Sequence, residues 1–195
     1  MGRSLIRGVP FVAVVFTLAL AAQSAAAETC RGSADSGTAT SSFDSETGVT
    51  TFTGTEAADV ILGTNGPDLV YGLGGDDKIC SLKGDDHVIG GPGNDQIAGG
   101  NQDDNLWGGP GDDLIKGVSQ NDHLVGGNGE DRLEGEAGTD NILGGSADDQ
   151  LFGGAGNDKL DGDNAEPTFG FGSGDFCDGG KGAKNTFLNC ELSPP

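Results

Sequence analysis

Aliphatic and acidic side chains recur at fixed intervals through the middle of this chain. From Gly54 to Asp161 the sequence divides into twelve rows of nine residues, with no insertion or deletion. The eighth residue of every row is Ile, Leu or Val, from Ile61 to Leu160, and the sixth residue is always Asp. The first residue is Gly in eleven rows, and Ser81 replaces it in the fourth. A period this short and regular predicts a solenoid that binds metal as it coils.

Each row contains a turn followed by a short strand. Gly is frequent at the first, second and fourth positions, where it permits the backbone angles that a tight turn needs. Positions seven to nine alternate in direction, so the aliphatic eighth residue points to one side and its two neighbours point to the other. Two rows then form one coil of eighteen residues, and coils stack about 4.8 Å apart. The sequence predicts an all-β protein in which two parallel sheets enclose a thin aliphatic core.

The sixth-position aspartates are the candidate metal ligands. They are Asp59, Asp68, Asp77, Asp86, Asp95, Asp104, Asp113, Asp122, Asp131, Asp140, Asp149 and Asp158. Runs of charge commonly mean a solvated acidic face, but twelve phased carboxylates beside glycine-rich turns favour a hard cation such as Ca²⁺, which takes six to eight oxygen ligands. The chain has 31 acidic and 10 basic residues and a formal net charge of −21. That charge argues against nucleic acid and anionic membrane surfaces as partners.

The rows resemble the G-G-x-G-x-D-x-U-x nonapeptides of the RTX, or haemolysin-type, calcium-binding family. The resemblance is close over residues 54–161 and looser over 170–187. It implies a right-handed parallel β-roll in which Ca²⁺ lies between the turn of one row and the turn two rows later. The sixth-position Asp and backbone carbonyls would be its ligands, with up to about ten ions, five along each edge. The flanking cysteines are similar to those of small secreted bacterial members, of actinobacterial type.

Charge and core size together predict that this array folds only with its metal. Residues 54–161 hold 22 acidic and 5 basic residues, a charge that ten divalent ions would nearly balance. The core offers one aliphatic side chain per row, and a glycine-rich chain has much conformational entropy to lose. We therefore expect calcium binding and folding to be one event. Rows six and eight carry Gln102 and Gln120 at the glycine-preferring fourth position, so the site between Asp104 and Asp122 is expected to be the weakest.

The residues before the rows are typical of a secretory leader. Arg3 and Arg7 precede an apolar run, and small residues end at Ala27, which predicts a signal peptide over residues 1–27. A membrane anchor is the alternative, although the apolar run is short for a span. We expect residues 28–53 to form an N-terminal cap segment, 54–161 the β-roll, and 162–195 degenerate repeats and a C-terminal cap. The mature protein is then secreted and has no membrane span.

Export would place the four cysteines in an oxidising compartment. Four cysteines allow three pairings, and we favour Cys30–Cys80 and Cys177–Cys190, one bridge at each end of the array. Free thiols are the alternative.

The final residues contain two decayed rows. The segment 162–169 breaks the phase, and the row 170–178 keeps Asp175 but places Cys177 at the core position. In the row 179–187, Lys184 stands in place of Asp. Terminal repeats of a solenoid are atypical because they cover an otherwise open core.

One outward column of the even-numbered rows forms an apolar stripe. Its ninth-position members are Tyr71, Ile89, Trp107, Val125 and Leu143. The stripe is either cross-strand packing or a docking surface for a second copy or a cell-surface partner. On the other sheet Cys80 is expected to point outward.

No catalytic constellation accompanies these features. His87 and His123 lie two coils apart and are expected to be exposed strand residues rather than metal ligands. The motifs of zinc proteases, nucleophilic-elbow hydrolases and P-loop enzymes are missing from the sequence. We expect a non-enzymatic calcium-binding protein; the alternative is an adhesin or surface-interaction protein stiffened by Ca²⁺.

Overall fold

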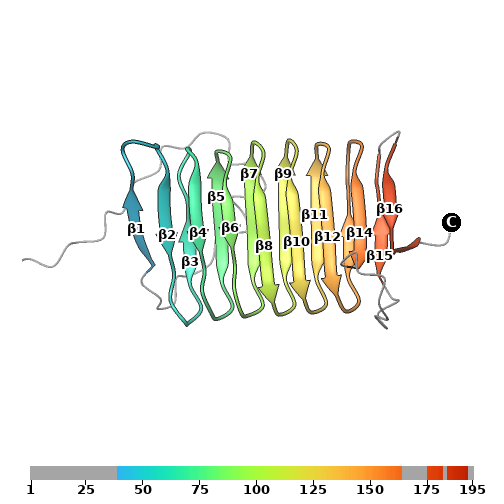
Figure 1. Cartoon of the computed structure of the whole chain (residues 1–195), viewed down its shortest axis with the longest axis horizontal. Coiled ribbons are helices and arrows are strands. Elements are labelled where there is room, and N and C mark those ends of the chain that lie inside the picture. Colours follow the sequence, from blue (N-terminus) through green and yellow to red (C-terminus); the bar gives the residue numbers. More distant parts are fainter. Residues whose placement is uncertain (1–38, 164–174, 182–183, 193–195) are drawn as a thin grey trace, which may run out of the picture.

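The computed structural model describes residues 39–163, 175–181 and 184–192. Every regular element in these ranges is a β-strand, and the strands stack along one axis in sequence order (Figure 1). The strands build a β-solenoid of about six coils, which confirms the predicted all-β parallel roll. The described residues contain no helix of the length and hydrophobicity that a membrane crossing requires.

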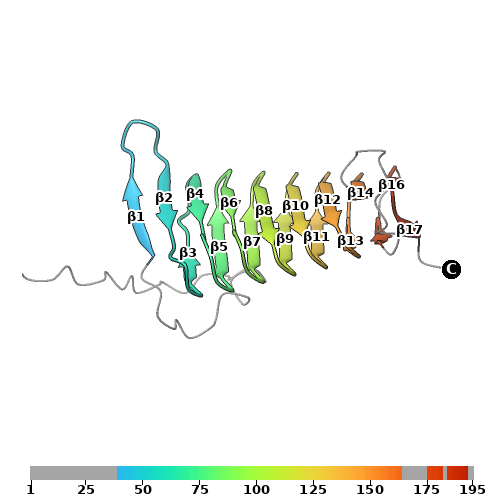
Figure 2. The ribbon, with the colours of Figure 1, turned by 60° about the horizontal axis from the view of Figure 1, so that its bottom comes forward.

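Alternate strands belong to two facing sheets (Figure 2). The nine-stranded sheet, called sheet A here, has the order β1 (Thr40–Phe43), β2 (Thr50–Thr53), β4 (Asp68–Tyr71), β6 (His87–Ile89), β8 (Asn105–Pro110), β10 (His123–Asn128), β12 (Asn141–Ser146), β14 (Lys159–Asp163) and β16 (Thr186–Leu188). The eight-stranded sheet B has the order β17 (Glu191–Leu192), β15 (Phe176–Asp178), β13 (Gln150–Phe152), β11 (Arg132–Ala137), β9 (Leu114–Ser119), β7 (Gln96–Asn101), β5 (Lys78–Lys83) and β3 (Val60–Leu62).

Strand register follows the eighteen-residue coil. Leu124 of β10 pairs with Leu106 of β8 and with Ile142 of β12, all in parallel. Several strands are longer than the expected three residues, because pairing continues into the next row, as between Gly127 and Gly145. The end of the segment expected to form the N-terminal cap is β2, which pairs in parallel with β4. In addition, β1 pairs with β2 antiparallel and ends sheet A.

The core is the column of eighth-position aliphatic side chains. All twelve are buried, and they form one continuous cluster: Ile61, Val70, Ile79, Val88, Ile97, Leu106, Ile115, Leu124, Leu133, Ile142, Leu151 and Leu160. Phe52 packs against this cluster, and Cys177 belongs to it, as its place at the core position predicts. Because each side chain stacks on the same position of the next coil, the cluster has no single centre.

The last row begins one residue later than the spacing of the sequence predicts. Thr186 pairs with Lys159, and Phe187 pairs with Leu160, so Phe187 occupies the eighth position. The sixth position is therefore Asn185 and not Lys184. The reason is a hydrogen bond, because the N–H of Asp158 donates to Oδ1 of Asn185 at 2.9 Å, and a lysine side chain cannot accept one.

The outer faces of the two sheets differ. On sheet B, Cys80 is buried rather than solvent-exposed, and it forms a small second cluster with Ala98, Val118 and Leu82. Cys80 is disulfide-bonded, and its expected partner Cys30 lies outside the described residues. Farther along sheet B, Lys116 forms an ion pair with Glu134.

Sheet A carries the expected stripe in register, with Trp107 beside Ile89 and Val125 on neighbouring strands. Its five members are half-buried. The ring of Trp107 lies 4.5 Å from that of His87 and 5.9 Å from that of His123, measured between centroids. The two histidines are therefore half-buried against an aromatic ring rather than fully exposed.

Candidate calcium ladders

The turns of the coils gather at two edges of the solenoid. With the rows numbered from Gly54, the turns of odd rows lie at one edge and those of even rows at the other. We call these the odd edge and the even edge. The odd edge holds Asp59, Asp77, Asp95, Asp113, Asp131 and Asp149, and the even edge holds Asp68, Asp86, Asp104, Asp122, Asp140 and Asp158. All twelve side chains are buried, with at most 3% of their surface exposed.

Each aspartate from Asp77 onward accepts a hydrogen bond from the coil before it. The N–H of Asp104 donates to Oδ1 of Asp122 at 2.9 Å, and the N–H of Asp113 donates to Oδ1 of Asp131 at 2.8 Å. The same bond joins every consecutive pair along both edges. A turn N–H that would be buried without a partner is therefore satisfied by a carboxylate, which is a strong acceptor. This bond could not be predicted from the sequence, because spacing alone does not tell which way a side chain leans.

The second carboxylate oxygen is buried without a hydrogen-bond partner at most of these positions. This holds for Oδ2 of Asp77, Asp86, Asp95, Asp104, Asp113, Asp122, Asp131, Asp140 and Asp158. A buried polar oxygen with no donor is costly, and an ionised one is costlier still. Repeated at the same position of successive rows, such an oxygen indicates a site built for a group that supplies positive charge.

Backbone carbonyl oxygens lie beside these carboxylates. A methyl group on Gly72 would overlap both Oδ2 of Asp77 and the carbonyl oxygen of Gly90, which comes from the next coil. The corresponding glycines Gly90, Gly108, Gly126 and Gly144 have the same two neighbours. A side chain at the first position of these odd rows would therefore collide with a carboxylate and a carbonyl that converge on it. Convergent oxygens of these two kinds are the ligands that Ca²⁺ takes.

The spacing of the ladder limits the number of carboxylates at any one point. Within the described ranges, no group of three or more Asp, Glu, His or Cys side chains is arranged to hold a metal. A cation between two coils would therefore need main-chain carbonyls to complete its shell, and the turns supply them. His87 and His123 take no part, because they lie on the outer face of sheet A.

Burial disfavours the ionised form of the aspartates and raises their pKa. Removal from water is the largest cause and raises the pKa to about 6 at Asp77, Asp86, Asp95 and Asp140, to about 7 at Asp113, and to about 8 at Asp104, Asp122 and Asp131. Neighbouring carboxylates raise the pKa further, as Asp86 and Asp122 do for Asp104. The main-chain N–H bonds act in the opposite direction. Without a cation, the ionised ladder is thus unfavourable in the folded state.

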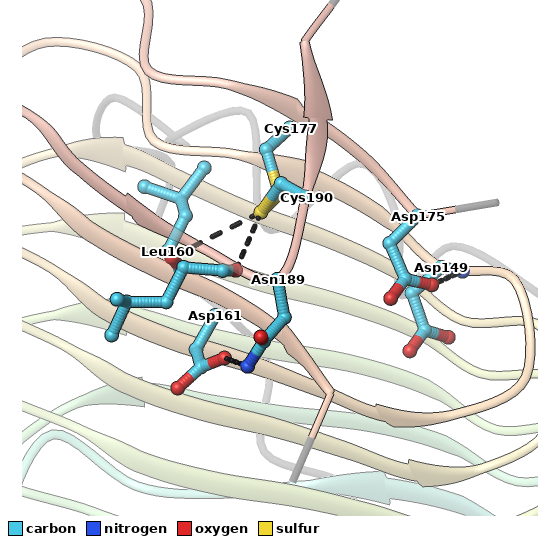
Figure 3. The surroundings of a disulfide bond; sticks show 8 residues. Asp149, Leu160, Asp161, Asp175, Cys177, Asn189 and Cys190 are labelled. Carbon is cyan, nitrogen blue, oxygen red and sulfur yellow. Dashed lines mark hydrogen bonds between the residues drawn. A yellow bond between two sulfur atoms is a disulfide. The ribbon is translucent and has the colours of Figure 1, made fainter. Parts of the chain in front are cut away.

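Both ladders continue into the C-terminal rows. The N–H of Asp149 donates to Oδ1 of Asp175 at 2.8 Å, although the two residues are 26 apart in sequence (Figure 3). The disulfide between Cys177 and Cys190, expected from the sequence, lies close to this end (Figure 3). On the even edge the ladder ends on the amide of Asn185. One edge therefore ends on a carboxylate and the other on a neutral group.

A second, exposed ladder runs through the fifth positions and was not foreseen. Oδ1 of Asp76 accepts the N–H of Asn94, Oδ1 of Asn94 accepts that of Asp112, and Oδ1 of Asp112 accepts that of Glu130. These side chains lean toward the following coil, whereas the sixth-position aspartates lean toward the preceding one. Side-chain hydrogen bonds thus join each coil both to the preceding coil and to the following one. The frequent Asn and Asp at the fifth position are the sequence feature that could have predicted this second ladder.

The family comparison agrees with this geometry. The model of the RTX calcium-binding nonapeptide repeat, which spans four copies, matches overlapping windows that together cover residues 53–165. A comparison with curated proteins finds no significant match. The repeats of this family bind Ca²⁺, and the buried aspartate series fits that chemistry. With the family model matching more than half of its length, the chain belongs to the RTX calcium-binding repeat family.

Proposed function

We propose that this protein is a secreted, non-enzymatic calcium-binding β-roll that folds as it binds several Ca²⁺ ions. The observation that carries the proposal is the series of buried Oδ2 atoms, with a carbonyl oxygen of the adjacent coil beside those of Asp77, Asp95, Asp113, Asp131 and Asp140. The proposed ligands are the twelve sixth-position aspartates, Asp59 to Asp158, with turn carbonyls. Residues 54–161 form the calcium-binding roll, between cap segments 28–53 and 162–195.

Bound Ca²⁺ would supply the positive charge that the aspartates lack. Each aspartate from Asp77 onward would then divide its two oxygens, because Oδ1 accepts an N–H of the protein while Oδ2 faces the cation. Pairing turns two rows apart gives up to about ten ions, five along each edge, each with oxygen ligands as Ca²⁺ requires. That number would nearly neutralise the array.

The same arrangement explains why folding should require the ion. At neutral pH the unfolded chain keeps its carboxylates hydrated, and the fold must bury them. Extracellular calcium modules bind near 10⁻⁴–10⁻³ M, so such sites would be empty at the low calcium of a cytoplasm and filled outside the cell. Secretion, supported by the leader-like residues 1–27, would then trigger folding.

Calcium titration of the mature chain tests this proposal. We expect the far-ultraviolet circular dichroism signal of β-structure to appear with Ca²⁺ and to vanish in excess chelator, and calorimetry to record uptake of several ions in parallel. Mg²⁺ is the matched control, because its small octahedral shell suits dedicated protein cages poorly. A complete β signal in chelator at pH 8, or no calcium uptake at millimolar concentration, would refute the proposal.

The sites should not fill equally. Gln102 and Gln120 adopt positive φ angles of 85° and 77° in the turns around Asp104 and Asp122. Side chains with a Cβ are strained there, which supports the expectation that the site between these two aspartates is the weakest. Site-resolved occupancy at limiting Ca²⁺ would show it filling last, and early filling would contradict the idea.

The alternative is a calcium-stiffened adhesin that uses the stripe on sheet A. The half-burial of these side chains and the packing of Trp107 between two histidine rings favour a cross-strand packing role instead. Trp107→Ser would separate these possibilities. A packing role predicts lower thermal stability with unchanged surface binding, whereas an adhesin would lose its partner.

A further inference from the structure

The exposed large apolar side chains of the described residues lie at the ends of the solenoid. Phe43 of β1 is 67% exposed, Leu62 of β3 is 49% exposed, and Leu73 in the turn after β4 is 39% exposed. At the other end, Phe187 and Leu188 of β16 are 36% and 43% exposed. The coils between these ends have no such side chain among the residues that the structure describes. Exposed apolar surface confined to two places indicates contact sites there.

The same ends carry the terminal strands of both sheets. Sheet A runs from β1 to β16 and sheet B from β3 to β17 (Figure 2). In the described part of the chain, no strand pairs with the outer edges of these four strands. Edge strands present main-chain N–H and C=O groups that can pair with another chain. Solenoids usually end in repeats with a polar outer face, and these ends depart from that rule.

The two ends differ in charge. Residues 39–77 contain no Lys or Arg, and Asp44, Glu46 and Glu56 are exposed there. At the C-terminal end Lys159, Lys181, Lys184 and Asp178 are exposed, whereas Asp161 and Asp175 are buried. The first end is therefore acidic and the second is rich in lysine, although the chain as a whole is strongly acidic. The acidic N-terminal ends of two molecules would repel each other, whereas the N-terminal end of one molecule and the C-terminal end of another would attract.

We propose that the N-terminal end of one calcium-loaded molecule docks on the C-terminal end of a second copy. In this contact β1 and β3 of one copy face β16 and β17 of the other, and acidic residues face lysines. Such a head-to-tail contact uses two different surfaces, so it continues into linear filaments rather than closing as a symmetric dimer. It goes beyond calcium binding, and it places self-association at the ends rather than on the apolar stripe.

Light scattering and sedimentation of the calcium-loaded chain test the proposal. We expect the mass to rise with protein concentration and to fall as salt is added, because exposed charge pairs are screened. Phe43→Ser with Glu46→Gln blocks the N-terminal end, and Lys181→Gln with Lys184→Gln blocks the C-terminal end. Each pair should weaken association at least about tenfold. Trp107→Ser is the matched control on the flank and should leave the association unchanged.

Mixing the two end-blocked variants gives the sharpest result. Each variant alone retains one working end and should be monomeric, whereas the mixture should form a one-to-one dimer and nothing larger. A wild-type chain that stays monomeric in calcium, a mixture that stays monomeric, or an association lost only in Trp107→Ser would overturn the proposal. Calcium uptake and the β signal, measured on every sample, distinguish this failure from failure of calcium binding itself.

Discussion

The odd and even edges have the same aspartate ladder but differ in the turns that present it. In the even edge, five residues other than glycine have positive φ: Leu82, Gln102, Val118, Gln120 and Glu136. In the odd edge of the described rows there are two, Leu73 and Ala147. The odd edge also continues to a carboxylate at Asp175, whereas the even edge stops at the amide of Asn185. Both edges carry the same carboxylates, so the turn residues set how well each proposed site is held. The even edge should therefore bind calcium more weakly.

Calcium removal at different pH should give the largest effect and should act on both edges. The folded-state pKa of buried aspartates such as Asp113 and Asp122 is about 7 and about 8, above the ordinary value of 3.8. The folded state therefore binds more protons than the unfolded state, and stability falls as pH rises. Without Ca²⁺ we expect a fold near pH 4 that is lost progressively up to pH 8, measured by circular dichroism. With saturating Ca²⁺ the fold should persist at pH 8; a calcium-free chain that is more stable at pH 8 than at pH 4 would contradict the assignment.

Amide substitution on each edge should separate the two ladders. In Asp113→Asn and Asp122→Asn the Oδ1 acceptor remains, as Asn185 shows at the end of the even edge, but one of the proposed anionic calcium ligands is lost. We expect the calcium midpoint of folding to weaken about tenfold for Asp113→Asn, since affinity follows ligand charge. Asp122→Asn should weaken it less, because its site already contributes little.

A calcium-free measurement at pH 8 provides the control for these two variants. Both substitutions remove a buried charge, so the residual calcium-free structure should become more stable rather than less. If the calcium midpoint of folding weakens equally in both variants, the two edges are equivalent.

Relief of backbone strain should bring the edges closer together. Gln102→Gly and Gln120→Gly remove a Cβ from turns with positive φ, and each should stabilise the calcium-loaded fold by up to about 1 kcal/mol. The even-edge sites should also tighten. Ala147→Gly is the matched variant on the odd edge, where φ is 92°, and it should stabilise without changing the weakest calcium site. A lower melting temperature in either glutamine variant would mean that the side chain itself supports the turn.

Conversion of the terminal amide to a carboxylate should have the smallest effect. Asn185 accepts from Asp158, and its Nδ2 donates to the carbonyl oxygen of Gly179 at 2.6 Å. Asn185→Asp removes that donor and adds charge next to Asp158, so the calcium-free chain should lose stability. In calcium the added ligand should raise the calorimetric stoichiometry by at most one ion, and an unchanged stoichiometry would place the end of the even ladder before Asp158.

The fold and the positions of the ladder aspartates could be predicted because the same nine-residue period fixes the core side chains and the aspartates. Once Ile61 to Leu160 occupy the core, the aspartates two residues earlier in each row are confined to the turns. The direction of each side chain could not be predicted, since only coordinates show that Oδ1 of Asp122 reaches the N–H of Asp104.

The ends of the chain were harder to predict than the rows. In the last row glycine spacing pointed to Lys184, but the acceptor of a hydrogen bond sets the register, and only Asn185 can provide it. Likewise, alternation along a strand correctly placed Cys80 on the outer side of sheet B, but it could not show that Ala98 and Val118 form a second cluster with it.

Bonds between identical row positions make the length of this protein adjustable. Removal of residues 90–107, one whole coil, would bring the N–H of Asp86 to Asp122 and that of Asp77 to Asp113, which are chemically the same partners as before. The molecule would shorten by about 4.8 Å, while the hairpin at its beginning and the disulfide at its end would be untouched. The fold thus behaves as a spacer whose length is set by the number of coils. That length is independent of the structure at either end.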